Sequence, residues 1–271
     1  MSLCLRSPAK INLFLHVHAK RHDGYHDLST LIHTISLFDC VTLELDDSDH
    51  FHCLHSAIQS PQNLAVRARD LFRMKTGWIH PVSITLDKKI PIEAGLGGGS
   101  GNAATVLWGM NQLSGLDVAE SELQNWSAEL GSDIPFYFSR GVALCEGRGE
   151  RVTNIDDHRE CEMTLVKPEM SLKTPEVFQA FRATSNDRER SQKLLCRFQE
   201  GFFPFENDLE AAAFSLSPKL RDFKNDLLSL TSSVSMSGSG SAFFCLGHHR
   251  IYPGYQSWPV LFHYRQNGEW Y

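Results

Sequence analysis

The stretch PIEAGLGGGSGNAA at residues 91–104 constrains the fold more than any other part of the sequence. Five of the seven residues from Gly95 to Gly101 are glycine, so a ligand can approach their backbone amides without meeting side chains. The preceding VSITLDKKI alternates like a strand, and a helical pattern begins near Asn102. Backbone amides at a helix N-terminus bind phosphate oxygens, helped by the helix dipole. The stretch therefore predicts a polyphosphate-binding loop.

The amino-acid sequence of this loop excludes two common phosphate-binding motifs. A P-loop requires GxxxxGK[ST], and no lysine follows these glycines. A dinucleotide-binding fingerprint requires GxGxxG, and Ser100 or Asn102 stands at the third glycine position. A flexible linker is the alternative interpretation, which the close flanking strand and helix patterns disfavour.

The overall charge offers no general surface for anions. The 271 residues include 26 Lys and Arg against 32 Asp and Glu, which gives a formal net charge of −6. An anionic ligand therefore needs a local site, and non-specific nucleic-acid binding is disfavoured. The sequence has no apolar run of membrane-spanning length, and its seven cysteines lack the spacing of a disulfide framework or zinc ribbon. We expect a cytoplasmic protein without nucleic-acid or membrane partners.

Strand and helix patterns mix without a strict repeat, which indicates an α+β fold. The length favours two domains, and we place the boundary between residues 150 and 160, giving domains of 1–152 and 153–271. Strands are expected at 11–17, 41–45, 82–90, within 141–152 and at 161–168, and helices at 62–77, from 102, at 118–130, 174–183 and 208–230, with a charged connector at 185–190. The residues after 246 fit either a closing strand or an interaction edge.

A histidine-rich stretch offers a rival functional site. His50, His52, Cys53 and His55 could assemble into a zinc or nickel site. The spacing fixes no further ligand, and no HExxH pair is present, so an edge strand and loop is the simpler interpretation.

The glycine loop, together with SPAKINLFLHV and RHDGYHDLST, resembles the GHMP kinases, which include galactokinase, homoserine kinase, mevalonate kinase and phosphomevalonate kinase. The segments LGSDIPFYF, GVALCEGRGE, LKTPEVF, FENDLE and MSGSGSAFF extend the resemblance from about Ser7 to Leu246. It implies a ribosomal protein S5 domain 2-like N-terminal domain, a ferredoxin-like C-terminal domain and a cleft for both substrates between them.

The resemblance also implies the reaction, which is ATP-dependent phosphorylation of a small alcohol that carries a cytidine diphosphate group. A kinase for another alcohol, such as homoserine or mevalonate, is the first alternative. A catalytically silent nucleotide-binding or metal-binding protein is the second.

The family's catalytic pair falls on Lys10 and Asp133. An alcohol that attacks a γ-phosphoryl group needs an acceptor for its proton, and Asp133 would be this base. Lys10 would stabilise developing negative charge and keep the carboxylate ionised. Taken alone, a surface lysine and a helix-capping aspartate would be the simpler interpretations.

The resemblance further implies binding residues for ATP and for the alcohol substrate. Those for ATP are Pro91, Ile92, Glu93, Ala94, Gly95, Leu96, Gly97, Gly98, Gly99, Ser100 and Gly101, with Asn63 and Leu64 near the adenosine. Those for the substrate are Asn12, Tyr25, His26, Phe178, Gly238 and Gly240, where Tyr25 and Phe178 would stack on cytosine; Phe178 as a helix core residue is the alternative.

Magnesium is the second expected cofactor. Family members often read GGGSS where this chain reads GGGSG, so Ser100 is the hydroxyl expected to face Mg²⁺. The ion would otherwise be held by ATP phosphates and water. We expect a monomer or a weak homodimer.

Overall fold

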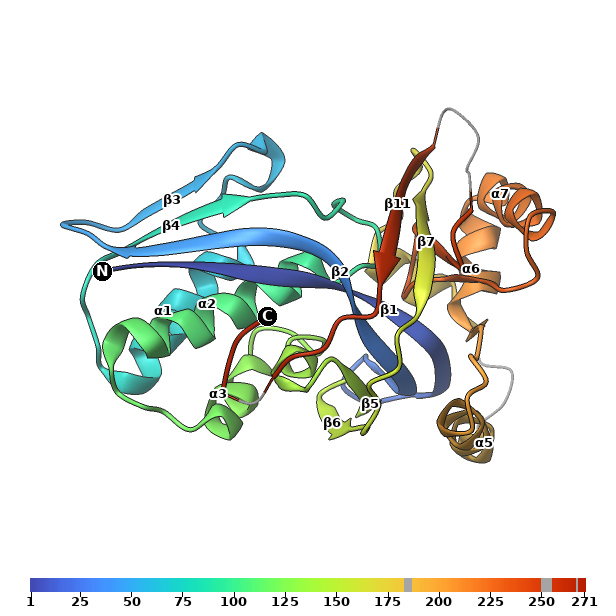
Figure 1. Cartoon of the computed structure of the whole chain (residues 1–271), viewed down its shortest axis with the longest axis horizontal. Coiled ribbons are helices and arrows are strands. Elements are labelled where there is room, and N and C mark those ends of the chain that lie inside the picture. The colour runs from blue at the N-terminus through green and yellow to red at the C-terminus, as the bar shows by residue number, and fades with distance from the viewer. Residues whose placement is uncertain (183–186, 250–254, 267) are drawn as a thin grey trace.

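The computed structural model describes residues 1–182, 187–249, 255–266 and 268–271. Within them, strands form two sheets that follow one another along the molecule's long axis (Figure 1). The first has seven strands in the order β3-β4-β2-β1-β8, with β5 pairing to β2 and β6 to β5. The second has four antiparallel strands in the order β11-β7-β10-β9. The mixture of helices and sheets confirms the predicted α+β content.

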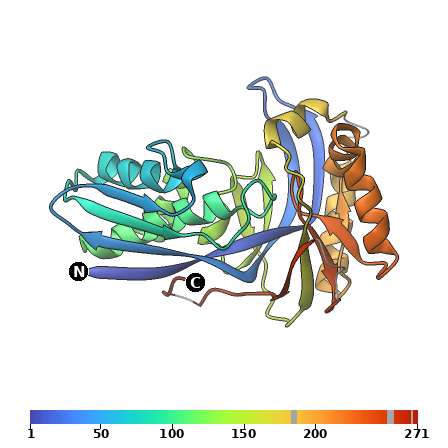
Figure 2. The same ribbon diagram turned by 90° about the horizontal axis from the view of Figure 1, so that it is seen from above.

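Two long antiparallel strands, β1 (Ser2–Lys20) and β2 (His26–Leu45), form the centre of the first sheet (Figures 1 and 2). The predicted strands at 11–17 and 41–45 are only parts of them. Residues 7–17 of β1 are buried throughout, so the sequence there lacks the alternation of a half-exposed strand. This central position places Lys10 and Asn12 in the interior.

The other strands of the first sheet are β3 (His50–Cys53), β4 (Val82–Asp87), β5 (Val142–Gly147) and β6 (Arg151–Asn154). Helices α1 (Leu64–Thr76), α2 (Gly98–Ser114) and α3 (Glu120–Ser127) share an apolar core with it, and two short 3₁₀ turns, Ser56–Ile58 and Pro135–Phe138, lie in the connections. Gly77 ends α1 in the left-handed conformation, which agrees with the helix predicted over 62–77. Asn63, predicted only as a residue near the adenosine, also caps α1 by accepting a hydrogen bond from the Ala65 amide at 2.9 Å.

Helix α2 begins inside the glycine loop, four residues before its predicted start near Asn102. Glycine is a poor helix former, which is why the sequence pattern favours a later start. Close packing on β1 overrides this preference, because a Cβ at Gly101 would lie 2.9 Å from Ser7 Oγ and 3.0 Å from the Pro8 carbonyl oxygen.

The second sheet consists of β7 (Glu162–Lys167), β9 (Val234–Met236), β10 (Phe243–Leu246) and β11 (Gln256–Leu261). Helices α4 (Thr174–Ala180), α6 (Leu209–Leu216) and α7 (Pro218–Leu228) pack against it in a separate core. The helix predicted for 208–230 is interrupted at Ser217 because Pro218 begins a new helix and cannot continue the hydrogen-bond pattern of the old one.

The prediction of a charged connector at 185–190 is wrong for residues 188–190, which belong to a helix. Residues 185 and 186 lie outside the described residues. Arg188–Gln199 form α5, which Asp187 caps by accepting a hydrogen bond from the Arg190 amide at 3.0 Å. The high charge of this segment reflects the exposed face of a helix rather than a loop.

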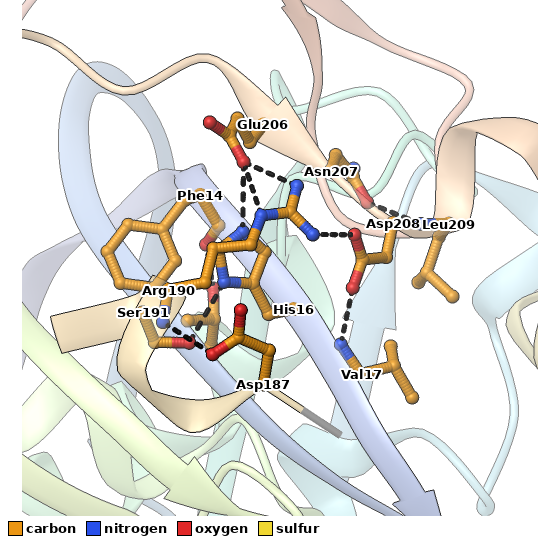
Figure 3. A network of polar contacts seen from close by, with 11 residues as sticks. Phe14, His16, Val17, Asp187, Arg190, Ser191, Glu206, Asn207, Asp208 and Leu209 are labelled. Atoms are coloured by element: carbon orange, nitrogen blue, oxygen red, sulfur yellow. Dashed lines mark hydrogen bonds and ion pairs between the residues drawn. The ribbon is translucent and has the colours of Figure 1, made fainter. Parts of the chain in front are cut away.

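Helix α5 and the short strand β8 (Glu206–Asn207) attach the second half of the chain to β1. Figure 3 shows the contacts: Arg190 bridges the carboxylates of Glu206 and Asp208, and the buried His16 ring reaches Glu206 at 3.3 Å. Its other nitrogen lies 2.9 Å from Ser191 Oγ on α5. The two halves are therefore joined by an added strand as well as by packing.

The chain after β11 returns to the first half, where residues 262–266 and 268–271 run beside the first sheet (Figures 1 and 2). Trp270 belongs to the same apolar core as α1 and α2. The residues after 246 thus include a strand, β11, at the edge of the second sheet, followed by a segment that returns to the first half. None of the helices in the described residues has the length and apolarity needed to cross a membrane.

Candidate active site

A cavity of about 1140 Å³ opens between the glycine loop, β1, α4 and the loop before β10. It is lined by both predicted catalytic residues, by every predicted ATP-binding residue except Gly101, and by every predicted substrate-binding residue except Gly240. Two regions distant in sequence, around residues 10–26 and 174–239, meet there. The fold thus gathers almost all the predicted residues around one space.

Lys10 and Asp133 face one another in this cavity, with 3.9 Å between Nζ and a carboxylate oxygen. The lysine is buried, whereas the Asp133 side chain is 48% exposed. Lys10 Nζ donates a hydrogen bond to Asn12 Oδ1 at 2.6 Å, and the Asn12 amide donates to Thr30 Oγ1 at 2.8 Å. Asn12 therefore orients the ammonium group instead of standing alone at the substrate position.

Burial lowers the pKa of Lys10 below its ordinary value of 10.5, and the nearby Asp133 carboxylate opposes this shift. A buried ammonium group is costly unless it is paired and hydrogen-bonded, and Lys10 has both kinds of partner. The pair presents one fixed positive charge and one accessible carboxylate to the cavity.

The glycine loop is held by the protein itself at several positions. Gly95 and Gly97 have φ of +75° and +67°, a conformation that disfavours side chains. A Cβ at Gly97 would lie 2.3 Å from Tyr137 Oη, which donates a hydrogen bond to the Gly97 carbonyl oxygen at 2.9 Å. The Lys10 amide donates to the Leu96 carbonyl oxygen at 2.9 Å. These glycines serve internal packing as well as ligand approach.

Gly99 differs from its neighbours. It is exposed, lines the cavity, and a Cβ there would meet only Leu64 Cδ1 at 3.7 Å, an ordinary contact. Ser100 also lines the cavity, whereas Gly101 is buried against Ser7. Ser100 is the only residue from 95 to 101 that carries a hydroxyl group.

A second glycine loop, formed by residues 237–242 between β9 and β10, packs directly on the first. Ser237 Oγ donates to the Gly95 carbonyl oxygen at 3.0 Å, and the Ala242 amide donates to the Ala94 carbonyl oxygen at 3.0 Å. Gly238 has φ of +58°, and a Cβ there would lie 3.3 Å from Lys10 Nζ. Gly240 instead packs on Met236, outside the cavity lining.

Aromatic side chains gather in another part of the cavity, near the β1–β2 turn, where His26 pairs with Lys20, ten positions along β1 from Lys10. His26 stacks on Phe178 with ring centroids 5.4 Å apart, and Phe181 meets the His26 ring edge-on at 6.1 Å. Tyr25 is 52% exposed, with the Arg148 guanidinium 4.9 Å from its ring centroid. Burial and Lys20 lower the pKa of His26, which favours the neutral imidazole with one donor and one acceptor.

Several basic cavity residues were missed by sequence reasoning, among them Lys20, Lys88, Arg148 and Arg182. Lys88 pairs with the fully buried Asp39, and its Nζ lies 2.9 Å from the position of a Cβ at Gly98. Asp39 also accepts hydrogen bonds from the amides of Lys89 and Ile90 at 2.8 Å each. The DKKIP text just before the loop was the available signal, since local positive charge suits phosphate.

The rival histidine stretch forms β3, an edge strand, and the 3₁₀ turn after it. In the part of the chain that the structure describes, His, Cys, Asp and Glu side chains nowhere gather in groups of three or more that could hold a metal ion. The stretch thus has the edge-strand arrangement that the simpler interpretation predicts.

Comparison with known proteins agrees with this geometry. The signature described as GHMP kinases N terminal domain matches residues 63–141, and that described as GHMP kinases C terminal matches residues 177–251. The 4-diphosphocytidyl-2-C-methyl-D-erythritol kinase of Protochlamydia amoebophila is 44% identical over 272 aligned residues, covering 100% of this chain and 93% of that protein.

Solved structures give the same result. A crystal structure of 4-(cytidine 5′-diphospho)-2C-methyl-D-erythritol kinase superposes with a TM-score of 0.79 and 33% identity, covering 96% of this chain and 100% of that one. A homoserine kinase from Cytophaga hutchinsonii, at 17% identity, 98% and 96% coverage and a TM-score of 0.73, shares the fold. The chain belongs to the GHMP kinase family, in the branch of the 4-diphosphocytidyl-2-C-methyl-D-erythritol kinases, and is a two-domain small-molecule kinase.

Proposed function

We propose that the protein transfers the γ-phosphoryl group of ATP to the 2-hydroxyl of 4-diphosphocytidyl-2-C-methyl-D-erythritol, a step of the non-mevalonate isoprenoid pathway. The observation that carries the proposal is one cavity whose lining combines a glycine-rich helix N-terminus, the Lys10–Asp133 pair beside it, and aromatic rings near the β1–β2 turn. Its volume of about 1140 Å³ exceeds that of an ordinary single-ligand pocket, which supports two ligands bound together.

In the proposed reaction, Asp133 accepts the proton of the attacking hydroxyl group. The accessible carboxylate supports this role, because a base must reach its substrate within hydrogen-bond distance. Lys10, fixed by Asn12, stabilises the negative charge on the reacting oxygens. The amides of the glycine loop and the N-terminus of α2 hold the phosphates of ATP.

In the aromatic part of the cavity, we assign recognition of the cytosine ring to Tyr25, His26 and Phe178. Phe178 contacts His26 at the cavity wall, which favours the binding role over the core role for this side chain. A neutral His26 supplies one donor and one acceptor for the edge of the base.

The donor set also fits magnesium. Ser100 supplies a hydroxyl oxygen at the cavity wall beside the loop, and oxygen ligands suit this hard cation. When bound with ATP, the ion supplies positive charge that offsets the charge of the phosphates. Ser100 would hold it together with phosphate oxygens and water.

We further assign residues 1–152 to an S5 domain 2-like unit and residues 153–271 to a ferredoxin-like unit. In chain order, the strands of the second sheet have the arrangement fourth, first, third, second, all antiparallel, which supports the ferredoxin-like assignment.

The test is a steady-state assay of ADP release with ATP and 4-diphosphocytidyl-2-C-methyl-D-erythritol, run beside homoserine and mevalonate. Turnover that requires the cytidyl substrate is expected, and CDP should compete with it. Turnover with homoserine or mevalonate, together with no inhibition by CDP, would replace the substrate assignment. The absence of turnover with all three, despite ATP binding, would contradict the kinase reaction proposed for this cavity.

A further inference from the structure

Residues 262–266 and 268–271, called here the C-terminal strap, connect the second sheet to the helices of the first. Backbone hydrogen bonds join His263 to Thr34 and Arg265 to Arg140, each at 3.1 Å. The Arg265 guanidinium pairs with the Glu120 carboxylate at the start of α3 and is itself buried. These contacts lock the strap to the first half of the molecule.

Trp270 is a second buried anchor of the strap. Its ring stacks on Trp108 of α2 with centroids 5.5 Å apart and meets the Phe138 ring at 5.6 Å. The Arg265 guanidinium lies 4.7 Å from the centroid of the indole, a distance typical of a cation–π contact. The side chain is thus fixed in orientation as well as position.

The indole of Trp270 is linked to the glycine loop through one buried hydroxyl. Trp270 Nε1 donates to Thr105 Oγ1 at 3.0 Å, and Thr105 Oγ1 donates to the Gly101 carbonyl oxygen at 2.8 Å. Thr105 is fully buried on α2, and Gly101 lies in the first turn of that helix. A threonine hydroxyl that bonds back to the carbonyl four residues earlier tends to bend a helix. The indole supplies the donor that fixes this hydroxyl.

We propose that Trp270 is a positioning residue for ATP, which sets the orientation of the first turn of α2 through Thr105. The proposal rests on the proposed function, because it assigns that turn to phosphate binding. Amide groups bind phosphate well only when they are held in place before the ligand arrives. The second half of the chain would thereby tune the affinity of a loop that belongs entirely to the first half.

Matched variants test the link. Trp270→Phe keeps an aromatic ring but removes the only donor of the indole, and Thr105→Val keeps the shape of threonine but removes its hydroxyl. Thr105→Ser retains the hydroxyl and serves as the conservative rescue. Trp126→Phe changes a tryptophan that packs on Phe72 in the same core without contacting α2's first turn in the contacts described, and it controls for lost packing.

The principal readout is the dissociation constant for a non-hydrolysable ATP analogue, measured by calorimetry on the whole protein. Trp270→Phe and Thr105→Val should each weaken binding by about fivefold, the effect of one hydrogen bond. The double variant should be only as weak as one single variant, because both remove the same link. Thr105→Ser and Trp126→Phe should bind like the unaltered protein.

Steady-state kinetics provide the second readout. The KM for ATP should rise, while the KM for the alcohol substrate should stay within about twofold of the unaltered value. If the variants lower the melting temperature but leave ATP-analogue affinity unchanged, Trp270 is structural only and the proposal is overturned. The calorimetric result stands without turnover, so an error in the substrate assignment would not be confused with a failure of this inference.

Discussion

Two parts of the cavity, called here the glycine-loop end and the aromatic end, present different chemical groups to a ligand. At the glycine-loop end, backbone groups are held by buried contacts from Tyr137, Ser237 and Lys10. At the aromatic end, half-exposed side chains from the β1–β2 turn and α4 form the wall, with Tyr25 and Phe178 among them. Backbone amides recognise phosphate in any nucleotide, whereas ring faces and edges distinguish one base from another. The first end suits what all family members share, and the second suits a particular substrate.

The largest effect is expected at the proposed base, Asp133. Asp133→Asn preserves shape but removes the proton acceptor, so kcat should fall by about 10²- to 10⁴-fold while both KM values change little. Lys10→Ala should also lose most of the rate. Steady-state kinetics with a thermal unfolding control checks both variants. Unchanged turnover in a folded Asp133→Asn protein would remove this residue from the mechanism.

Substitutions at two glycines of the same loop should distinguish a role in protein packing from a role in the approach of a ligand. Gly97→Ala places a Cβ 2.3 Å from Tyr137 Oη at a positive φ, so it should lower the unfolding free energy by about 2 kcal/mol or more. Gly99→Ala meets no close protein atom and improves helix propensity by roughly 1 kcal/mol, so stability should hold or rise while the KM for ATP increases. Denaturant unfolding and kinetics are measured on both. Equal loss of stability would contradict the distinction.

A smaller effect is expected at the aromatic end. Phe178→Leu removes the stacked ring beside His26, which should raise the KM for the cytidyl substrate about fivefold and leave the KM for ATP unchanged. Val177→Ala changes the buried neighbour on the same helix and should lower stability without altering either KM. A rise in the ATP KM of Phe178→Leu would show that the two ends are not independent.

The smallest effect on the cavity is expected from His33, whose ring stacks on Phe262 in the interior. Burial lowers its pKa from 6.5 to about 3, so the unfolded chain takes up a proton first as the pH falls below 6.5. Stability should therefore fall from pH 6.5 downward, with about 2 kcal/mol lost through this residue by pH 5.

Denaturant unfolding at pH 7 and pH 5 measures this loss. His33→Phe should reduce the difference between the two pH values, even though it also removes the hydrogen bond to the Thr34 carbonyl oxygen. Neither KM should change at pH 7. An unaltered pH difference in the variant would show that other histidines, such as His16 and His263, carry the effect.

Local patterns predicted much of the fold, and the family resemblance predicted about half of the residues that line the cavity. The helix at 62–77 was predicted because its periodicity and its glycine stop are both local features of the sequence. The start of α2 was not, because it depends on the contact of Gly101 with β1, ninety-odd positions earlier in the chain. Gly240 was placed in the site by motif alone, whereas its packing on Met236 is a feature of three-dimensional structure.

The same reason explains the segments that were missed. The many charged residues of α5 made the segment resemble a loop, because the apolar face of this helix is narrow. Its main buried residues are Leu194, Leu195 and Phe198. The C-terminal strap has no local signal for its destination, since its partners Thr105 and Glu120 lie about 150 positions away. The proposed catalytic pair, in turn, was predicted from family motifs rather than from spacing.

Because Trp270 is buried in the core of the first half, that core can be completed only after the C-terminal residues have been synthesised. During synthesis, the segment carrying the glycine loop leaves the ribosome long before residue 270, so its core must wait with the place of that indole unfilled. Contacts of such long sequence separation slow folding and prolong exposure of apolar surface. We therefore expect the core of the first half to be complete only when the second half of the chain has been made.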